Sequence, residues 1–274
     1  MKVDGISAIV TGSSMGIGRA IAVELAGRGA QVVCTARSEA RLRDTVDAIK
    51  SEGGVALAVP TDVTDTSQVE RMAEQTLNAF GKIDVLINNA AVFHGIGGLW
   101  EVDPDAWWAD VKTKLFGGFL CCRAVLPHMM KQNNGIIMNM AGGGYDQPNV
   151  GGTGYASASA GLMRLTDTLA SELGDANNIQ VYGLWPGFVR SEMTEILATA
   201  EQGQRWLPHV KKGLSLGQDH AAEDVALAVV KIIEHTCPAL SGRIVSYEED
   251  FEKIVERAEA IREKDLYQLR LRSE

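Results

Sequence analysis

The sequence predicts a single α/β domain built on a doubly wound parallel sheet of about seven strands. Short segments rich in β-branched residues, each flanked by turn residues, alternate along the chain with helical patterns. Because parallel strands are joined by right-handed helical crossovers, this alternation places helices on both faces of the sheet. The 274 residues, of which 46% are hydrophobic, suffice for one large core.

Seven segments have the composition of buried strands and cover residues 6–10, 31–35, 55–60, 84–87, 135–140, 179–184 and 242–246. Six helical patterns cover residues 16–29, 39–52, 67–80, 104–131, 155–173 and 221–235. The fourth helix has a clear start, because Asp103 can cap it and Pro104 suits its first position. We expect residues 1–247 to form the domain. Residues 248–274 are charged and amphipathic, and we expect a helical extension that packs on the body or on a partner subunit.

Charge and cysteine content argue against several classes of protein. A net charge of −9 and a pI near 5.1 provide no basic face for nucleic acid. The four cysteines show neither a disulfide framework nor metal-ligand spacing, so we expect buried thiols, a cytoplasmic location and no metal. No run of about 18 apolar residues is present, so we expect no membrane association.

A glycine-rich turn joins the first strand to the first helix, in the order Thr11-Gly12-Ser13-Ser14-Met15-Gly16-Ile17-Gly18. Glycines let the backbone turn tightly and approach a pyrophosphate, whose charge is met by free amides at the helix N-terminus. A glycine triplet alone is weak evidence, but its place between strand and helix favours nucleotide binding. The predicted contacts in this turn are Gly12, Ser14, Gly16, Ile17 and Gly18.

The spacing T-G-x-x-x-G-x-G resembles that of the short-chain dehydrogenase/reductase family, classical type, and further motifs follow in that family's order. The Asp62-Val63 pair follows the third strand, Asn88-Asn89-Ala90-Ala91 matches N-N-A-G, and Pro186-Gly187 with Ser191 resembles P-G-x-x-x-T. The resemblance covers nearly the whole chain and implies a Rossmann-type fold and a nicotinamide cofactor. It also implies further cofactor contacts at Asp62, Val63, Asn89, Ala90, Tyr155, Pro186, Gly187, Val189 and Ser191.

Cofactor preference is read directly after the second strand, where this chain has Arg37. An aspartate there would accept hydrogen bonds from the ribose 2′-hydroxyl, whereas an arginine can pair with a 2′-phosphate. We therefore predict NADP(H), with NAD(H) as the alternative if Arg37 is an ordinary solvated charge. Met15 stands where NADP(H)-using relatives often have a second basic residue, so the pattern is incomplete.

The catalytic residues of the family are Asn, Ser, Tyr and Lys, and this chain departs from that set. Tyr155 matches the family tyrosine, but the lysine position one helical turn later is Ser159. The family serine falls on Gly142 or Ala141, neither of which has a hydroxyl. Lys114 stands where the family asparagine usually lies. Of the tetrad, only Tyr155 is retained.

We hypothesise that Lys114 projects its amine into the space vacated at Ser159 and restores a cation beside Tyr155. Such a lysine could lower the tyrosine pKa, bind the ribose or relay a proton. In the alternative, Lys114 is a surface or interface lysine on a helix that also contains Lys112.

Several other side chains could contact a substrate. His94, Tyr145, Asp146 and Gln147 lie on loops that follow strands, where ligands bind in such sheets, although each could equally be a structural or solvated residue. Residues 188–218 resemble the family's substrate lid. Its apolar residues, together with Trp100 and Trp185, could line a pocket for a bulky substrate, and they are Met193, Ile196, Leu197, Trp206 and Leu207. Polar groups there are Arg190, Glu192 and His209.

The function that these observations favour is NADP(H)-dependent reduction of a carbonyl or similarly polarised double bond, with Tyr155 as proton donor. Reduction is favoured because a phenol with a high pKa still donates a proton, whereas oxidation needs the phenolate. Two alternatives remain, a non-redox enzyme that dehydrates, eliminates or cyclises, and a silent partner subunit that binds cofactor. We expect a small-molecule substrate and a homodimer or homotetramer formed through the long fourth and fifth helices.

Overall fold

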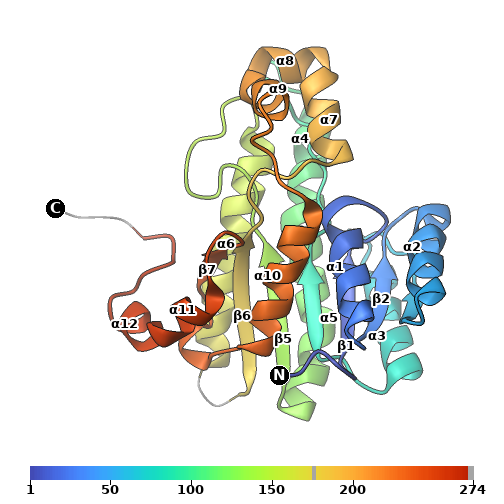
Figure 1. Cartoon of the computed structure of the whole chain (residues 1–274). Helices are drawn as coiled ribbons and strands as arrows, with labels where there is room; N and C mark the ends of the chain where they lie inside the picture. Colours follow the sequence, from blue (N-terminus) through green and yellow to red (C-terminus); the bar gives the residue numbers. More distant parts are fainter. Residues whose placement is uncertain (175–176, 271–274) are drawn as a thin grey trace.

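A computed structural model describes residues 1–174 and 177–270 (Figure 1). Its centre is one seven-stranded sheet in the order β3-β2-β1-β4-β5-β6-β7, with every neighbouring pair parallel. The strands are β1 (Ser7–Thr11), β2 (Gln31–Thr35), β3 (Val55–Ala58), β4 (Val85–Asn88), β5 (Gly135–Met140), β6 (Ile179–Trp185) and β7 (Ile244–Ser246). After β3 the chain passes to β4, which lies on the opposite side of β1 from β2. The direction in which successive strands are added to the sheet therefore reverses at β1. The predicted doubly wound sheet is confirmed.

Two layers of helices cover the sheet. In β1, Ala8 and Val10 pack into one core cluster and Ile9 into the other, because successive side chains of a strand point to opposite faces. The first cluster includes residues of α1 (Gly16–Gly27), α2 (Glu39–Ser51) and α10 (Ala222–Glu234). The second includes residues of α3 (Thr66–Phe80), α5 (Gly117–Gln132) and α6 (Thr153–Leu173). Strands buried on both faces are therefore apolar almost throughout.

The sequence predicted one helix over residues 104–131, but this segment is not α-helical throughout. It consists of α4 (Pro104–Val111), a π-helical turn η1 (Lys112–Phe116) and α5. Asp103 caps α4 by accepting a hydrogen bond from the Ala106 amide. A π turn widens the helix by one residue, a change that periodicity does not reveal and that often marks a functional site. Here it contains Lys114.

Residues 188–218 form three short helices beyond the carboxyl ends of the strands, where Figure 1 shows them grouped at the top of the molecule. They are α7 (Glu192–Thr199), α8 (Glu201–Trp206) and α9 (Pro208–Ser215). Their buried side chains Leu197, Leu207 and Val210 form a small cluster of their own, separate from the two large ones. The segment is therefore a distinct cover over one end of the sheet.

The C-terminal extension packs on the body of its own chain. After the short turn η2 (Pro238–Leu240) and β7 come α11 (Phe251–Glu256) and α12 (Ala258–Glu263). Phe251, Ile254 and Ile261 are buried in the first core cluster, whereas Leu266 is 41% exposed. The Ile244 amide of β7 donates to the carbonyl of Tyr267 at 2.8 Å. The tail thus contacts β7, the edge strand of the sheet, at Tyr267, and residues 271–274 lie outside the described residues.

Three further findings concern the cysteines, membrane-spanning helices and metal ligands. Cys34, Cys121 and Cys122 are buried thiols, and Cys237 is partly buried. Within residues 1–174 and 177–270, no helix combines the length and apolarity that a membrane crossing requires. The same part of the chain contains no group of three or more histidine, cysteine, aspartate or glutamate side chains arranged to hold a metal ion.

Candidate active site

A cavity of about 950 Å³ opens at the carboxyl ends of the strands, which is where ligands bind in sheets of this type. It runs from the glycine-rich turn and Arg37 at one end to Tyr155 and Lys114 at the other. Most of the predicted cofactor contacts line it, namely Gly12, Ser14, Gly16, Ile17, Arg37, Asp62, Val63, Asn89, Ala90, Tyr155, Pro186 and Ser191. The fold therefore brings together segments from six different strand ends in one cavity.

The glycine-rich turn fits the approach of a pyrophosphate. Gly12 has φ +68° and Gly16 has φ +53°, both in the left-handed region that favours glycine. A Cβ on Gly18 would lie 2.4 Å from the Gly12 carbonyl oxygen and 2.5 Å from the Asn89 side-chain nitrogen. Gly18 does not line the cavity itself, but it lets the first turn of α1 press against the strand. Met15, the N-cap residue of α1, makes no side-chain hydrogen bond to the first-turn amides. Uncapped amides at a helix N-terminus can bind a phosphate.

The loop after β4 is tied to this turn by hydrogen bonds. The Thr11 hydroxyl accepts from the amides of Asn89 at 2.9 Å and Ala90 at 3.0 Å. The Asn89 side chain donates to the carbonyl of Thr11 at 2.9 Å. These bonds fix the middle of the cavity relative to its glycine end, so that both halves of a dinucleotide would meet one rigid wall.

The segment after β6 carries the last predicted cofactor contacts. Pro186 and Ser191 line the cavity, and Ser191 also caps α7, accepting from the Thr194 amide at 3.3 Å. Gly187 has φ +71°, and a Cβ there would lie 2.3 Å from the Tyr247 ring. Val189 is buried at 4% exposure. Gly187 and Val189 therefore support this wall from behind and do not line the cavity.

Tyr155 lies in the first turn of α6, with its ring stacked on Phe93 at 4.5 Å between centroids and 8° between planes. Its hydroxyl points at Gly142, where a Cβ would lie 2.7 Å from the phenol oxygen and 2.8 Å from the Ser159 hydroxyl. Any side chain at position 142 would displace the phenol from this place. The Ser159 hydroxyl is fully buried and has no hydrogen-bond partner among residues 1–174 and 177–270.

Lys114 is directed into the protein and is only 3% exposed, so it is not a surface lysine. Its ammonium donates to the carbonyls of Met140 at 3.0 Å and Ala141 at 3.4 Å, where β5 ends. It also lies 5.1 Å from the centroid of the Tyr155 ring. The π turn thus places an amine from the position of the family asparagine beside the tyrosine ring. That this amine fills the space vacated at Ser159 stays a prediction.

The pKa values of Lys114 and Tyr155 bear on one part of that hypothesis, the effect of the lysine on the tyrosine. Burial lowers the pKa of Lys114 to about 8. Burial raises the pKa of Tyr155 to about 12, and the negative charge of Asp110 adds to the rise. Of the three roles open to Lys114, a lowering of the tyrosine pKa is therefore not found, because burial disfavours the phenolate. Tyr155 is a protonated phenol over the physiological pH range.

Asp110 is a site residue that the sequence reasoning missed. It is fully buried one turn before Lys114, and it accepts from the amides of His94 at 2.7 Å and Gly95 at 3.0 Å. Burial raises the pKa of this carboxyl, whereas the two amide hydrogen bonds lower it. Asp110 thereby fixes the loop that carries Phe93 and His94, both of which line the cavity. Its only signal in the sequence is an acidic residue four positions before Lys114.

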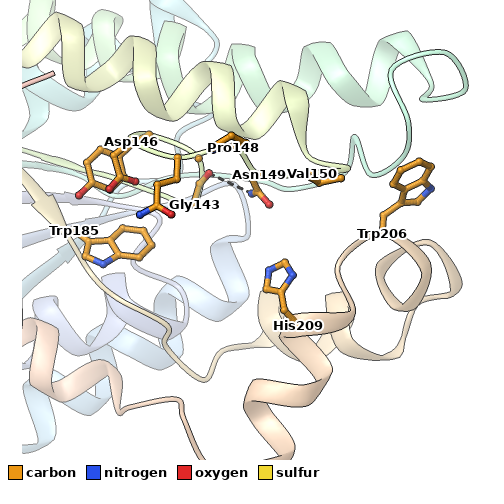
Figure 2. A pocket seen from close by; sticks show the side chains of 11 residues that line it. Gly143, Asp146, Pro148, Asn149, Val150, Trp185, Trp206 and His209 are labelled. Carbon is orange, nitrogen blue, oxygen red and sulfur yellow. Dashed lines mark hydrogen bonds between the residues drawn. The ribbon is translucent and has the colours of Figure 1, made fainter. Parts of the chain in front are cut away.

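A second pocket, of about 420 Å³, lies between the loop 143–150 and the 188–218 segment (Figure 2). Tyr145, Asp146 and Gln147 line it with Trp185, Trp206 and His209. The Tyr145 and Trp185 rings lie 5.5 Å apart at one end, and Figure 2 shows Trp206 at the opposite end with His209 between them. Of the other predicted substrate contacts, Met193, Ile196 and Leu197 line the large cavity instead.

Three other residues predicted to contact a substrate have contacts within the protein instead. Leu207 is 1% exposed and belongs to the core of the 188–218 segment. Trp100 is 80% exposed and meets Trp206 edge to face. Arg190 pairs with Asp219 and Glu195, which holds the segment together. None of these three lines either pocket in the part of the chain that the structure describes.

Comparison with known proteins agrees with the fold. Residues 7–202 match the family model of the short chain dehydrogenases. A short chain dehydrogenase of Pseudocercospora fijiensis (strain CIRAD86) is 32% identical over 266 residues, which cover 94% of this chain and 85% of that protein. The 3-oxoacyl-(acyl-carrier-protein) reductase FabG of Haemophilus influenzae is 36% identical over 238 residues, covering 87% of this chain and 94% of the reductase.

A solved structure shows the same architecture. Levodione reductase superposes with a TM-score of 0.80 at 25% identity, covering 89% of this chain and 96% of that one. The fold and the large cavity define a Rossmann-type oxidoreductase scaffold. The chain belongs to the short-chain dehydrogenase/reductase family.

Proposed function

We propose that this protein is an NADP(H)-dependent oxidoreductase that reduces a carbonyl or a similarly polarised double bond, with Tyr155 as the proton donor. The observation that carries the proposal is the single cavity that joins the glycine-rich turn and Arg37 to Tyr155 and Lys114. Such a cavity can hold an extended dinucleotide with its reactive end beside a proton donor.

The residues present fit a nicotinamide dinucleotide. The turn around Gly12 and Gly16 would hold the pyrophosphate, Asp62 and Val63 the adenine, and Arg37 a 2′-phosphate. When bound, the cofactor supplies the hydride. NAD(H) remains the alternative, because the preference depends on a pairing between phosphate and arginine that only binding can demonstrate.

Tyr155 is suited to donate a proton and poorly suited to accept one. With its pKa raised to about 12, the phenol is protonated throughout the range in which enzymes work. A proton donor completes reduction by protonating the substrate heteroatom as hydride arrives, whereas oxidation would require the phenolate. The buried phenol therefore favours the reductive direction.

Lys114 is proposed as the positioning cation of the site. Its ammonium, fixed by the Met140 and Ala141 carbonyls, can direct positive charge at the tyrosine ring and at the ribose of a bound cofactor. A pKa of about 8 keeps most of the amine charged at neutral pH. A cation in this place would stabilise negative charge that develops on the phenol during proton transfer.

The second pocket and the apolar part of the large cavity support a bulky substrate with a ring or long apolar part. Tyr145, Trp185 and Trp206 present aromatic surface, and Asp146 and His209 present polar groups between them (Figure 2). FabG is named for the reduction of 3-oxoacyl groups and levodione reductase for reduction of levodione. A carbonyl substrate is consistent with both relatives.

Self-association through the predicted fourth and fifth helices, residues 104–131 and 155–173, is part of the proposal. Phe116 and Phe119 are 39% and 42% exposed and stack on each other at the start of α5, and Met130 near its end is 51% exposed. An apolar helix face of this kind is typical of an interface between subunits. A homodimer or homotetramer would cover it.

The proposal is tested by titrating the protein with NADPH and NADH by fluorescence, then following absorbance at 340 nm with ketones, aldehydes, imines and enones. We expect tighter binding of NADPH and substrate-dependent oxidation. Binding without oxidation, together with turnover of a substrate at constant nicotinamide absorbance, would instead identify a non-redox enzyme. Failure to bind either cofactor would reject the proposal.

A further inference from the structure

An ion pair spans the adenosine end of the large cavity. The Arg41 guanidinium on α2 donates to the Glu192 carboxylate at 2.9 Å, and Glu192 is the first residue of α7. Both side chains line the cavity. The pair therefore joins the wall beside Arg37 to the helix that covers the substrate end, two elements 151 positions apart in the sequence.

Arg41 occupies the place of the basic residue that the glycine-rich turn lacks. Its Nη1 lies 3.7 Å from the sulfur of Met15. Arg37, Ser38 and Arg41 line the same end of the cavity. The structure thus places a second guanidinium, that of Arg41, over the turn at Met15. Arg41 belongs to α2 and lies four residues after Arg37.

The pair with Glu192 is weak enough to exchange. The two side chains are 50% and 49% exposed, and ion pairs at such positions contribute about 0 to 1 kcal/mol. A phosphate monoester carries about −1.5 to −2 charges and three acceptor oxygens, so it competes well with one carboxylate for an arginine. If a phosphate took the place of the Glu192 carboxylate as the partner of Arg41, the loss of the ion pair would therefore cost little free energy.

We infer that Arg41 is shared between Glu192 and the 2′-phosphate of the cofactor, and that its transfer to the phosphate releases the N-terminal end of α7 from α2. The inference rests on the proposed NADP(H) preference and adds a residue and a consequence to it. Met193, Ile196 and Leu197 line the cavity from α7, so release of this helix changes the substrate end of the site. Cofactor discrimination and access to the substrate site are then coupled through one side chain.

The binding test uses two nucleotides that lack nicotinamide, adenosine 2′,5′-bisphosphate and 5′-AMP, with dissociation constants measured by calorimetry. We expect Arg41→Ala to weaken the bisphosphate about tenfold and 5′-AMP less than about twofold, since only the former carries a 2′-phosphate. Glu192→Gln should tighten the bisphosphate about two- to fivefold, because it removes a competing anion. Arg43→Ala is the matched control, an arginine of the same helix paired with Glu39.

The release of α7 is tested by amide hydrogen exchange of residues 192–199 in the same complexes. In the native protein the bisphosphate should accelerate exchange relative to 5′-AMP, and in Glu192→Gln this difference should vanish because the ion pair is already absent. Equal exchange in the two native complexes, or a difference that persists in Glu192→Gln, would overturn the coupling.

Comparison with Arg37→Ala separates this inference from the cofactor proposal. If Arg37→Ala weakens the bisphosphate but Arg41→Ala does not, the sharing of Arg41 is overturned and the NADP(H) preference stands. If neither variant discriminates the two nucleotides, both fail. If both variants weaken the bisphosphate selectively, a two-arginine phosphate site is supported.

Discussion

The two ends of the large cavity differ in how closely they keep to the family pattern. At the cofactor end, the glycine-rich turn and the Asn89 loop match the family motifs and are held by backbone contacts such as Gly18 against the Gly12 carbonyl. At the catalytic end, Gly142, Ser159 and Lys114 all depart from it. The difference reflects the kind of interaction involved. Close backbone contacts require glycine at fixed positions, whereas a charge acts through space and can be supplied by a residue of another element.

The catalytic end shows what such a rearrangement requires. The phenol of Tyr155 fills the space beside Gly142, and the cation comes from the π turn at Lys114 rather than from α6. Burial shifts the pKa of both groups toward their neutral forms, to about 12 for Tyr155 and about 8 for Lys114. At neutral pH the phenol is therefore protonated and most of the amine is still charged.

The largest expected effect is at the cofactor end. In Gly18→Ala the new Cβ would lie 2.4 Å from a backbone oxygen, so the turn must shift. We expect NADPH affinity to fall by more than about 100-fold, which is about 2.7 kcal/mol. The measurement is fluorescence titration. Gly27→Ala near the end of the same helix has free space around its Cβ and is the control, and equal affinity in the two variants would contradict a steric cradle.

The next effect concerns the relocated cation. Lys114→Met should lower kcat/KM about 100-fold, because the positive charge beside the proton donor is lost. The melting temperature should change little, since relief of the buried charge offsets the loss of the hydrogen bonds to Met140 and Ala141. Lys131→Met, at the exposed end of α5, is the control. Full turnover in Lys114→Met would defeat the hypothesis.

The pH profile sharpens this test. With its pKa at about 8, Lys114 loses its charge as pH rises through that value, so kcat/KM in the reductive direction should fall above pH 8. Because this pKa lies below the ordinary lysine value, the unfolded chain binds more protons between the two, and the contribution of Lys114 to stability rises with pH there. Lys114→Arg should remove the alkaline fall in rate. An unchanged profile in that variant would assign the fall to another group.

A smaller effect is expected where the family serine is missing. Gly142→Ser would place a Cβ 2.7 Å from the Tyr155 hydroxyl and push the phenol out of position. We expect kcat to fall about tenfold although a family residue is restored, because a displaced donor transfers its proton poorly. Steady-state kinetics with the best carbonyl substrate measures it, and Gly143→Ser is the neighbouring control. A gain in rate would show that the site still accommodates the family serine.

The smallest effect is expected at the buried carboxylate. Asp110→Asn keeps the shape but replaces an acceptor of two amide hydrogen bonds by a group with one acceptor oxygen. We expect a loss of stability of about 1 to 2 kcal/mol and a change in kcat of about threefold as the Phe93 loop loosens. Urea denaturation measures the first. Asp105→Asn, on the exposed start of α4, should leave both unchanged.

Much of the fold could be predicted because its signals are local. Strand and helix patterns, the Asp103 cap and the Gly12 to Gly18 spacing depend on neighbouring residues, and the described structure has these elements within a few positions. The amphipathic segment 248–274 was likewise predicted to be a packed helical extension, and the structure has two short helices there, α11 and α12. The contact of the tail with β7 was not predicted. The π turn was missed because one additional residue in a helix leaves no periodic signal.

The sequence by itself determined the sheet, the glycine-rich cradle, the place of Tyr155 and the absence of the family serine and lysine from their usual positions. Each of these depends on residue type and spacing along the chain. Only the tertiary structure decided that Lys114 points inward, that Asp110 lies beneath the Phe93 loop, and that Arg41 meets Glu192. Those contacts join elements distant in sequence, and burial and charge at such contacts depend on how the elements pack in space.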